Sequence, residues 1–464
     1  METIHLLEAL QRLLGNTRML TDTTSMAPFC LDQRRRYHGL ALAVLHPVTV
    51  TEVQQIVRLA ASAGVCIVPQ GGNTGLVGGA TPLPNGRHSL ILNLARLNTV
   101  RGWQDDTITV ESGIVLDQLN GLTAARGLQL PIDLASSGSA QLGGLIATNA
   151  GGMRVIRHGM MRQQVLGLEV VLANGEIWSD LRPLLKNNSG YDLKQLFIGA
   201  EGTLGVVTAA TLKLAPIPKQ VATAWIALPN VAKGMALLTQ LKLQAGDALT
   251  AFELISRTCI ELVARHVTDL SRPLAEDAPW YALVELATTH DRINLDTLLA
   301  DCLQQQGLLD AALAQNQAQT VQLWRWRELI PEAQRLAGGN IKHDIAVPCG
   351  AIPAFVTEAE QRLQERFPTV EIIAFGHAGD GNLHYNVAHT RSTPVETFLD
   401  ETEVNEIVYA LVQKAGGTFS AEHGIGQLKR DRLADCGDPT GIQLMRGMKA
   451  WLDPTGLFNP GKVI

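Results

Sequence analysis

The sequence predicts an α+β protein of two domains, and three observations support this fold class. Its 464 residues exceed what one hydrophobic core usually accommodates. Up to Pro216, short apolar runs alternate with dense glycine loops, whereas longer helical patterns follow that residue. Beyond Pro216 the chain also repeats a strand–helix–strand pattern, which is typical of a ferredoxin-like antiparallel sheet with helices on one face.

The N-terminal half opens with a predicted amphipathic helix in METIHLLEALQRLL. This segment contains acidic residues, which is unlike a signal or transit peptide. A second helix is predicted over residues 51–63, because apolar side chains recur there at helical spacing and Gly64 follows as a terminator. Short apolar runs near the glycine loops predict strands at residues 65–69, 89–94, 107–113, 165–175 and 205–214.

The C-terminal half contains the two predicted strand–helix–strand units. In each unit an apolar strand is followed by a helix with amphipathic spacing. The predicted elements are strands over 222–228, 249–254 and 280–286, with helices over 231–243 and 292–305.

The last residues, LDPTGLFNPGKVI, predict an extended segment docked on a neighbouring part of the chain. With the composition change near Pro216, this divides the sequence into three parts. We expect a first domain over 1–217, a second over 218–425, and a C-terminal segment over 426–464 that returns to the first.

Composition excludes several classes of partner. Apolar residues make up 46% and charged residues 18%, an ordinary balance for a soluble globular protein. The net charge is −6 and no Lys/Arg block is interleaved with aromatics, so nucleic acid and anionic membranes are poor candidate partners. The six cysteines are scattered, which argues against a disulfide framework, and no apolar stretch is long enough to span a membrane. We expect a cytoplasmic protein.

Three glycine clusters, at residues 69–79, 136–152 and 198–208, predict a site for a long ligand with a diphosphate. Successive glycines in PQGGNTGLVGG let backbone N–H groups approach an anion without obstruction by a Cβ atom. A Rossmann site would need a helix after the loop, but TPLPNGRH follows. A Walker loop would need G-K-[ST], which is absent there. Glycines that only close turns are the alternative, and three clusters in one half-chain disfavour it.

Five motifs make the sequence recognisable: PQGGNTGLVGG, TNAGG with RHG after it, GLEVVLANG, NNSGYDLKQLFIGAEGTLGVVT and the C-terminal FNP. From about Leu42 onward the chain resembles the FAD-linked dehydrogenases of the vanillyl-alcohol-oxidase (PCMH) type, and most closely their D-2-hydroxyglutarate dehydrogenase family. The resemblance implies a two-subdomain FAD-binding domain followed by the ferredoxin-like substrate domain, with FAD held non-covalently. It implies FAD contacts at Gly71, Gly72, Asn73, Thr74, Gly75, Gly78, Gly79, Ser137, Gly138, Gly143, Gly144, Thr148, Asn149, Gly205, Val207 and Asn459.

Residues 375–387, FGHAGDGNLHYNV, predict a β-hairpin in which His377 can meet His384 across the two strands. AEHGIG supplies Glu422 and His423 in a glycine-flanked turn. Two imidazoles and one carboxylate make a three-ligand metal set that leaves positions open for a substrate. The alternative for each histidine alone is an ordinary polar residue at a turn.

The resemblance assigns roles to these residues. It implies that His377, His384 and Glu422 bind a divalent metal, with zinc favoured, and that His423 is the catalytic base. A metal that binds the substrate lowers the pKa of its hydroxyl, and hydride then passes from C2 to flavin N5. The resemblance also implies that the substrate is held by Arg327, Lys342 and Asn386.

The predicted reaction is therefore oxidation of D-2-hydroxyglutarate to 2-oxoglutarate. One departure is Pro331, which stands where the family has a hydroxyl residue four positions after the arginine and would relax selectivity. A D-lactate or broad D-2-hydroxy-acid dehydrogenase is the alternative within the family. A metallohydrolase and a non-catalytic dinucleotide-binding protein are the alternatives outside it, although the first leaves the glycine clusters unexplained and the second the metal set.

The expected partners are a small 2-hydroxy acid and an electron acceptor. Electron-transfer flavoprotein, a quinone and a cytochrome are the candidate acceptors, and the sequence does not distinguish them. A homodimer is expected as one oligomeric state, although no sequence feature requires it.

Overall fold

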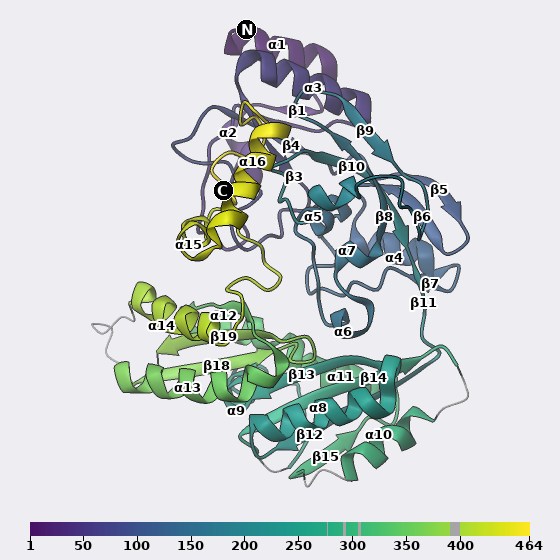
Figure 1. Cartoon of the computed structure of the whole chain (residues 1–464), viewed down its shortest axis with the longest axis vertical. Helices are drawn as coiled ribbons and strands as arrows, with labels where there is room; N and C mark the ends of the chain where they lie inside the picture. The colour runs from purple at the N-terminus through teal and green to yellow at the C-terminus, as the bar shows by residue number, and fades with distance from the viewer. Residues whose placement is uncertain (276, 291–293, 305–307, 390–399) are drawn as a thin grey trace. The chain divides into compact units, whose positions relative to one another are not determined.

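The computed structural model describes residues 1–464 except 276, 291–293, 305–307 and 390–399, and the chain forms two compact units (Figure 1). Unit 1 contains residues 1–151, 159–216 and 422–464. Unit 2 contains residues 152–158 and 217–421. Apart from the short excursion at 152–158, the chain passes from unit 1 to unit 2 after Pro216 and returns after Ala421; the predicted boundaries were 217 and 425.

Unit 1 begins with a four-stranded sheet in the order β1-β2-β4-β3. Strands β2 and β3 run parallel to β4, and β1 is antiparallel to β2. Helices α1 and α3 pack in the same hydrophobic core as these strands, and α2 covers other residues of β2 and β4. The elements are α1 Thr3–Leu14, β1 Met19–Leu20, α2 Thr23–Cys30, β2 Ala43–Leu45, α3 Val50–Ala63, β3 Cys66–Gln70 and β4 Ser89–Asn93.

Helix α3 confirms the predicted helix at 51–63 and shows why its ends lie where they do. The Thr49 side chain accepts a hydrogen bond from the Glu52 backbone N–H, which satisfies a free donor of the first turn. Gly64 ends the helix with a φ of 66°, a left-handed conformation that glycine adopts without strain. The side chains buried by this helix include Val53 and Ile56.

A second, five-stranded sheet of unit 1 is antiparallel throughout, in the order β5-β6-β10-β8-β9. Residues of α4, α5 and α7 pack in its core. Its strands and helices are β5 Val100–Gln104, β6 Thr107–Glu111, α4 Leu116–Ala124, α5 Leu142–Ala147, α7 Met161–Gln164, β8 Val165–Val171, β9 Ile177–Asp180 and β10 Val206–Lys213. The short elements β7 Leu128–Gln129 and β11 Ala215–Pro216 pair with each other, and a 3-10 turn spans Leu193–Leu196.

The C-terminal segment belongs to unit 1, where it forms α15 Arg430–Cys436 and α16 Pro439–Leu452, shown in yellow in Figure 1. Its last residues then run beside β3. The Ile67 backbone N–H donates to the Leu457 carbonyl at 2.8 Å, and the Asn459 N–H donates to the Ile67 carbonyl at 2.8 Å. The tail is therefore held along β3 by backbone hydrogen bonds, but it turns at residues 454–455 and 460–461 and is not extended throughout.

Unit 2 is built on one antiparallel sheet in the order β15-β12-β14-β13-β18-β19-β16, with β17 also paired to β19. Its first four strands lie in the spatial order fourth, first, third, second, which is the ferredoxin-like arrangement that the sequence predicts. The strands are β12 Gln220–Leu228, β13 Leu249–Ser256, β14 Trp280–Thr288, β15 Asp310–Leu313, β16 Asn340–Ile341, β17 Asp344–Ala346, β18 Val370–Gly376 and β19 Asn382–His389.

Helices cover both faces of this sheet. The helices of the two predicted units, α8 and α10, share one face as expected, but further helices cover the other face. Helices α8, α10, α13 and α14 contribute to one core. Helices α9, α11 and α12 contribute to a second core with Trp225, Ile255 and Tyr281. The reason is visible in β13, where every residue is buried, so apolar side chains point to both sides.

The bounds of the unit 2 helices complete its description. The predicted helix over 292–305 corresponds to α10, while residues 292, 293 and 305 lie outside the described residues. The helices are α6 Val155–His158, α8 Val231–Ala245, α9 Arg257–His266, α10 Leu295–Gln304, α11 Gln317–Glu328, α12 Ile330–Ala337, α13 Ile352–Arg366 and α14 Glu401–Lys414, with 3-10 turns at Gly246–Ala248 and Cys349–Ala351.

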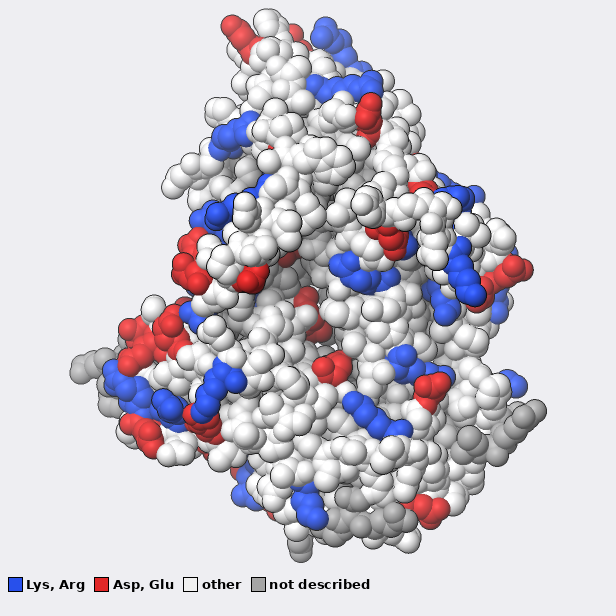
Figure 2. Space-filling view, viewed as in Figure 1, with Lys and Arg blue, Asp and Glu red and all other residues white. Residues whose placement is uncertain are grey.

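Charged side chains of both signs are interspersed over the face of the molecule seen in Figure 2. Within the described ranges, none of the helices combines the length and the apolar composition that crossing a membrane requires.

Candidate active site

The three glycine clusters of unit 1 meet in the folded chain. A Cβ atom on Gly72 would lie 1.9 Å from the Ser139 carbonyl oxygen, so the first two clusters touch through their backbones. The third cluster is joined to the second, because the Glu201 N–H donates to the Ala147 carbonyl at 2.8 Å. Segments that are up to about 130 positions apart therefore form one surface, as the single-ligand interpretation requires.

Asn459 ties the C-terminal segment to this surface. Its side-chain amide donates to the Gly79 carbonyl at 2.9 Å and to the Glu201 carbonyl at 2.8 Å. Its side-chain oxygen accepts a hydrogen bond from Lys462 Nζ at 2.6 Å. Burial lowers the pKa of the Lys462 ammonium to about 7, although the Glu201 carboxylate acts in the opposite direction. Asn459 thus links a predicted cofactor loop to a buried lysine.

Some of the predicted cofactor glycines leave space that a ligand could fill. A Cβ atom on Gly75 or Gly144 would meet no heavy atom within 4 Å. At Gly71 it would meet the Gln141 side chain at 3.3 Å. An open surface lined by glycine backbone is what an anionic cofactor needs, so the loops fit a dinucleotide.

Other predicted cofactor residues have structural partners in the protein. The Asn73 amide donates to the Leu31 carbonyl at 2.8 Å, and the Asn149 side-chain oxygen accepts from the Arg162 N–H at 2.9 Å. Thr148 Oγ1 donates to the Gly144 carbonyl at 2.9 Å. These contacts hold the loops in shape, which is compatible with a further role beside the cofactor.

Close packing limits several of the predicted glycines. A Cβ atom on Gly205 would lie 2.6 Å from Val170 Cγ1, and one on Gly143 would lie 2.9 Å from Ser112 Cβ. Val207 is a buried member of the same core. Gly78, which has a φ of 72°, lies against the ring of Tyr37. The other predicted cofactor residues, Thr74, Ser137 and Gly138, lie in the same two loops, where the Ser137 carbonyl accepts from the Asp117 N–H at 3.2 Å.

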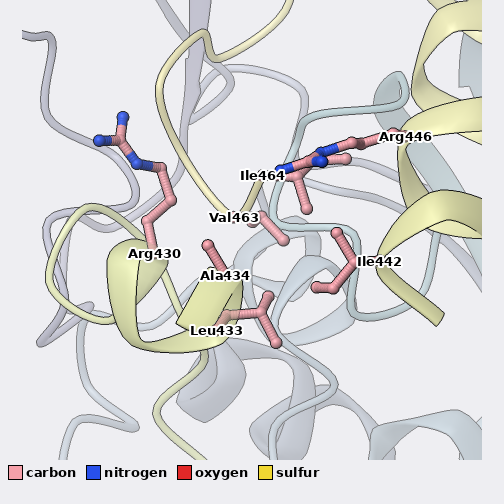
Figure 3. A pocket seen from close by; sticks show the side chains of 7 residues that line it. All are labelled: Arg430, Leu433, Ala434, Ile442, Arg446, Val463 and Ile464. Atoms are coloured by element: carbon pink, nitrogen blue, oxygen red, sulfur yellow. The ribbon is translucent and has the colours of Figure 1, made fainter. Parts of the chain in front are cut away.

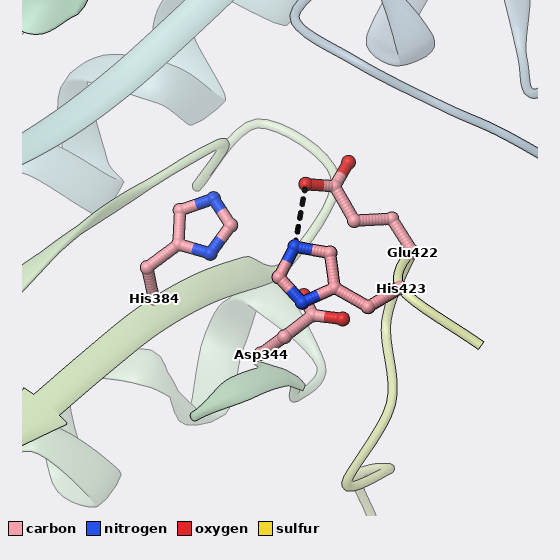
Figure 4. Close-up of side chains that lie close together, drawn as sticks. All are labelled: Asp344, His384, Glu422 and His423. Carbon is pink, nitrogen blue, oxygen red and sulfur yellow. Dashed lines mark ion pairs between the residues drawn. The ribbon is translucent and has the colours of Figure 1, made fainter. Parts of the chain in front are cut away.

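Four side chains form a candidate metal centre: Asp344, His384, Glu422 and His423 (Figure 4). Each offers one ligand atom, and these atoms all lie within 4.8 Å of one another. Nε2 of His423 lies 3.9 Å from Oε1 of Glu422. Imidazole nitrogens and carboxylate oxygens are common ligands of divalent metals such as zinc, so this donor set fits the predicted ion.

Local backbone pairing positions this cluster. Asp344 begins β17, and β17 pairs with β19, which carries His384 directly opposite Asp344. The segment just before Glu422 also pairs with β17, because the Thr418 N–H donates to the Ala346 carbonyl at 2.8 Å. The chain then continues directly into Glu422 and His423.

The sequence interpretation missed Asp344. Asn382 on β19 holds this carboxylate, since its Nδ2 donates to Asp344 Oδ1 at 3.0 Å. The available signal was an acidic residue in the apolar run of KHDIAVP, beside a histidine and close to the predicted substrate lysine. A buried acid in a short strand usually has a polar partner, so it was a candidate ligand.

The predicted ligand His377 is near the centre but has a different neighbour. Its ring lies 5.8 Å from that of His384, centroid to centroid, which confirms the predicted meeting across the hairpin. It is not among the four residues whose ligand atoms cluster within 4.8 Å. Its Nδ1 instead pairs with the Glu253 carboxylate. Metal binding by His377 stays a prediction.

Glu253 also pairs with Arg327, the predicted substrate residue. Arg327 Nε donates to the second oxygen of Glu253, and the guanidinium lies 4.7 Å from the centre of the Phe375 ring. Burial alone would raise the pKa of the Glu253 carboxyl, but Arg327 and His377 outweigh it and lower this pKa to about 2. The carboxylate is therefore ionised. The only sequence signal for Glu253 was one acid within the apolar strand LTAFELIS.

The two other predicted substrate residues lie between β16 and β17 and on β19, the strand with which both of them pair. Lys342 is exposed between these strands. Asn386 is buried; its Oδ1 accepts from the His343 N–H at 3.1 Å and its Nδ2 donates to Gln334 Oε1 at 3.2 Å. Pro331 occupies the first turn of α12, where a proline is compatible with the helix.

A separate small pocket lies in the C-terminal segment of unit 1 (Figure 3). Most of its lining side chains are apolar, and two arginines also contribute. None of the predicted site residues lines it. The lining residues are Arg430, Leu433, Ala434, Ile442, Arg446, Val463 and Ile464.

Two known protein families match the chain, one before and one after the boundary near Pro216. Residues 41–180 match the model of an FAD binding domain, and residues 217–463 match that of the FAD linked oxidases, C-terminal domain. The solved structure of p-cresol methylhydroxylase with substrate bound aligns with a TM-score of 0.76 at 16% identity, covering 99% of this chain and 96% of that chain. The chain is therefore an FAD-linked oxidoreductase with the PCMH-type fold.

The similar curated proteins define its place within this class. The D-2-hydroxyglutarate dehydrogenase of Xanthomonas citri pv. viticola is 39% identical over 98% of this chain and 96% of its own length. The mitochondrial D-2-hydroxyglutarate dehydrogenase of Rattus norvegicus is 37% identical over 96% of this chain and 82% of its own length. The chain belongs to the D-2-hydroxyglutarate dehydrogenase family.

Proposed function

We propose that this protein oxidises D-2-hydroxyglutarate to 2-oxoglutarate with FAD as the electron acceptor and with assistance from a divalent metal. The observation that carries the proposal is the cluster of Asp344, His384, Glu422 and His423 in a chain whose family is defined by FAD-linked dehydrogenases of that substrate. The candidate metal ligands are His384, Glu422 and Asp344, together with the predicted ligand His377. Zinc is favoured, because nitrogen and oxygen ligands of this kind suit it.

The metal and FAD would each supply one part of the chemistry. A divalent metal, when bound, would lower the pKa of the substrate hydroxyl, and FAD, when bound, would take the C2 hydride at N5. His423 would accept the hydroxyl proton as general base, and the C–O single bond of the substrate becomes the carbonyl of the oxo acid. One proton and one hydride leave the substrate, which balances its two-electron oxidation.

The chain's own cations would hold the substrate. Arg327 presents a planar guanidinium suited to a carboxylate, and Lys342 would read the distal carboxylate that distinguishes a diacid from D-lactate. Asn386 lies in the middle of β19, where its amide is oriented by His343 and Gln334. A distal carboxylate requires a cation that a short hydroxy acid does not.

Anaerobic flavin reduction tests this function directly. The purified protein is mixed without oxygen with D- and L-2-hydroxy acids of two to six carbons, and loss of the oxidised flavin absorbance is followed. D-2-hydroxyglutarate should bleach the flavin fastest and its L-enantiomer should not. Bleaching by no 2-hydroxy acid in the series would reject the proposal.

A broader D-2-hydroxy-acid dehydrogenase is the second candidate, and Pro331 is the observation that favours it. A proline has no hydroxyl with which to bind a carboxylate, so the hydrogen bond expected from the family pattern is missing. Comparable specificity constants for D-2-hydroxyglutarate, D-malate and D-lactate would support the broader activity. In either case a further acceptor must reoxidise the flavin; electron-transfer flavoprotein, a quinone and a cytochrome are the candidates.

A further inference from the structure

We propose that Glu253 is a positioning residue that holds the substrate-binding Arg327 and the metal-binding His377 in their working orientations. The inference rests on the proposed function, because only that function gives the two partners these roles. Glu253 stands in the middle of β13 and its side chain is completely buried.

The two oxygens of Glu253 are divided between its partners. Oε1 pairs with Nδ1 of His377, and Oε2 accepts a hydrogen bond from Nε of Arg327. Both partner side chains are only 8% exposed. The three residues come from β13, from the turn that follows β18, and from the last turn of α11, so one carboxylate connects three elements.

The sheet register explains this meeting. Strands β13 and β18 are antiparallel neighbours, with Ile255 opposite Phe375 and Leu254 opposite Gly376. Glu253 and His377 are the next residues along the two strands in this register. Because side chains alternate along β13, Glu253 shares the face of Ile255, which is the face covered by α11 and α12.

Pairing with Glu253 determines which ring nitrogen of His377 can bind a metal. When Nδ1–H is donated to a carboxylate, Nε2 carries the lone pair and is the nitrogen that can act as a ligand. Such carboxylate–histidine pairs are frequent behind zinc-binding histidines. Glu253 would therefore select the metal-binding tautomer of His377.

The same carboxylate orients the guanidinium of Arg327. Its Nε is committed to Glu253, and the Phe375 ring packs against its plane. The end-on edge of the guanidinium, with one N–H of each terminal nitrogen, then points away from Glu253 as a fork that could hold a substrate carboxylate. A buried ion pair by itself adds little to stability, so a purely structural role would give a weak reason for three charged or polar groups in this core.

A glutamine at position 253 cannot replace the glutamate. Its NH₂ group takes the place of one carboxylate oxygen, so one of the two partners faces a donor where it had an acceptor. Either Arg327 loses its acceptor, or His377 must accept from the amide and carry its proton on Nε2, where a metal could no longer bind. Glu253→Gln should thus disturb at least one of the two partners without changing side-chain size.

Glu285 offers a matched control in the same sheet. It lies on the neighbouring strand β14, is 7% exposed, and belongs to the same face as Ile255 through its register with Ala251. Its carboxylate accepts from Thr250 Oγ1 and from Trp324 Nε1, both at 3.0 Å. Glu285→Gln therefore removes a buried carboxylate from this core while leaving the Glu253 pairs intact.

The experiment measures zinc binding without turnover. Full-length, FAD-loaded protein is freed of metal with a chelator, and Zn²⁺ is titrated against a chromophoric competitor in wild type, Glu253→Gln, Glu253→Asp and Glu285→Gln. Glu253→Gln should weaken zinc binding by about 10- to 100-fold, the usual effect of losing a partner behind a ligand. Glu285→Gln should stay within about twofold of wild type.

Two further readouts separate positioning from a general loss of structure. In a His377→Ala background, Glu253→Gln should cause no additional loss of zinc affinity, because both changes remove the same ligand. With saturating zinc, Glu253→Gln should raise the KM for D-2-hydroxyglutarate about 10-fold or more, the cost of a lost charge-assisted contact. Glu253→Asp keeps the charge but has a shorter side chain that cannot reach both partners. If Glu253→Gln does not fold, Glu253→Asp should still show weaker zinc binding, a raised KM, or both.

The outcomes distinguish this inference from the proposed function. Zinc affinity and KM in both position-253 variants equal to those of Glu285→Gln would overturn the positioning role, as would wild-type protein that binds no zinc. Failure of the wild type to bleach its flavin with any D-2-hydroxy acid would instead reject the proposed function, while the zinc titration still reports on Glu253 and His377.

Discussion

Unit 1 and unit 2 build their candidate sites from different parts of the polypeptide. In unit 1 the site is backbone: glycines at 71–79, 138–144 and 199–205 bring main-chain groups together and leave open space at Gly75 and Gly144. In unit 2 the candidate site is built from side chains, with a buried carboxylate between an arginine and a histidine. A backbone surface suits an extended anionic cofactor, whereas placed side chains suit a small substrate that must be oriented.

The largest effect is expected where a side chain takes part in the chemistry. His423→Ala should slow flavin reduction by D-2-hydroxyglutarate by about 10²–10⁴-fold, because a positioned base is lost from the candidate metal cluster. Stopped-flow absorbance measures the rate, and FAD content should remain that of wild type. Wild-type reduction in this variant would remove His423 from the mechanism.

A smaller effect is expected at a residue that binds the substrate but takes no part in the chemistry. Lys342→Ala should lower the specificity constant for D-2-hydroxyglutarate by roughly 10- to 150-fold, because a charge-assisted hydrogen bond is worth about 1.5–3 kcal/mol. D-lactate, which lacks the distal carboxylate, should be affected far less. Steady-state kinetics on D-2-hydroxyglutarate, D-malate and D-lactate make the comparison, and equal losses on all three would contradict this role of Lys342.

Two glycines test the backbone half of the comparison. Gly72→Ala should destabilise the fold by about 1–3 kcal/mol or more, because the new methyl group would lie 1.9 Å from the Ser139 carbonyl oxygen. Gly75→Ala should change stability by no more than about 0.5 kcal/mol, since nothing lies within 4 Å of its Cβ position. Denaturant unfolding of the two variants without FAD measures this difference.

FAD affinity then shows what the open space at Gly75 is for. If the first loop holds the cofactor pyrophosphate, Gly75→Ala should release FAD more readily than wild type despite its unchanged stability. Fluorescence of released flavin on dilution measures this loss. Retention of FAD equal to wild type would indicate that Gly75 faces solvent instead of the cofactor.

The smallest effect concerns the buried lysine of unit 1. The pKa of Lys462 is lowered from 10.5 to about 7 in the folded chain, so between these values the unfolded state binds more protons than the folded state. The free energy of unfolding of FAD-depleted wild type should therefore rise with pH relative to Lys462→Met, by at most about 1.4 kcal/mol per pH unit. Urea titrations at pH 7, 8 and 9 check the slope, and parallel pH profiles would show that Lys462 keeps an ordinary pKa.

The contrast between the units also explains what could be predicted from the sequence. The glycine loops are contiguous, so PQGGNTGLVGG could be recognised as a ligand loop from its own residues. The hairpin of 375–387 was predictable for the same reason, because its alternation is local. Leu383, Tyr385 and Val387 do face the core, as the alternation requires.

Residues that act through partners far along the chain could not be found in this way. Glu253 is separated from Arg327 by 74 positions and from His377 by 124. Nothing in LTAFELIS states which residues will lie opposite, since strand pairing and helix packing decide that. Asp344 joins the cluster only because β17 pairs with β19 and with the segment before Glu422. The helices on the second face of the unit 2 sheet were missed because Thr250, Glu253 and Ser256 interrupt the apolar run of β13, so its sequence does not resemble a strand buried on both faces.

The metal dependence of flavin reduction tests the central proposal most directly. The FAD-loaded protein is stripped of divalent ions with a chelator, and its flavin absorbance is followed without oxygen after D-2-hydroxyglutarate is added, before and after Zn²⁺ is restored. We predict that the stripped protein keeps its FAD but is not reduced, and that Zn²⁺ restores reduction in wild type and not in His384→Ala. Full-rate flavin reduction under strict chelation, in wild type or in His384→Ala, would contradict the metal-assisted mechanism.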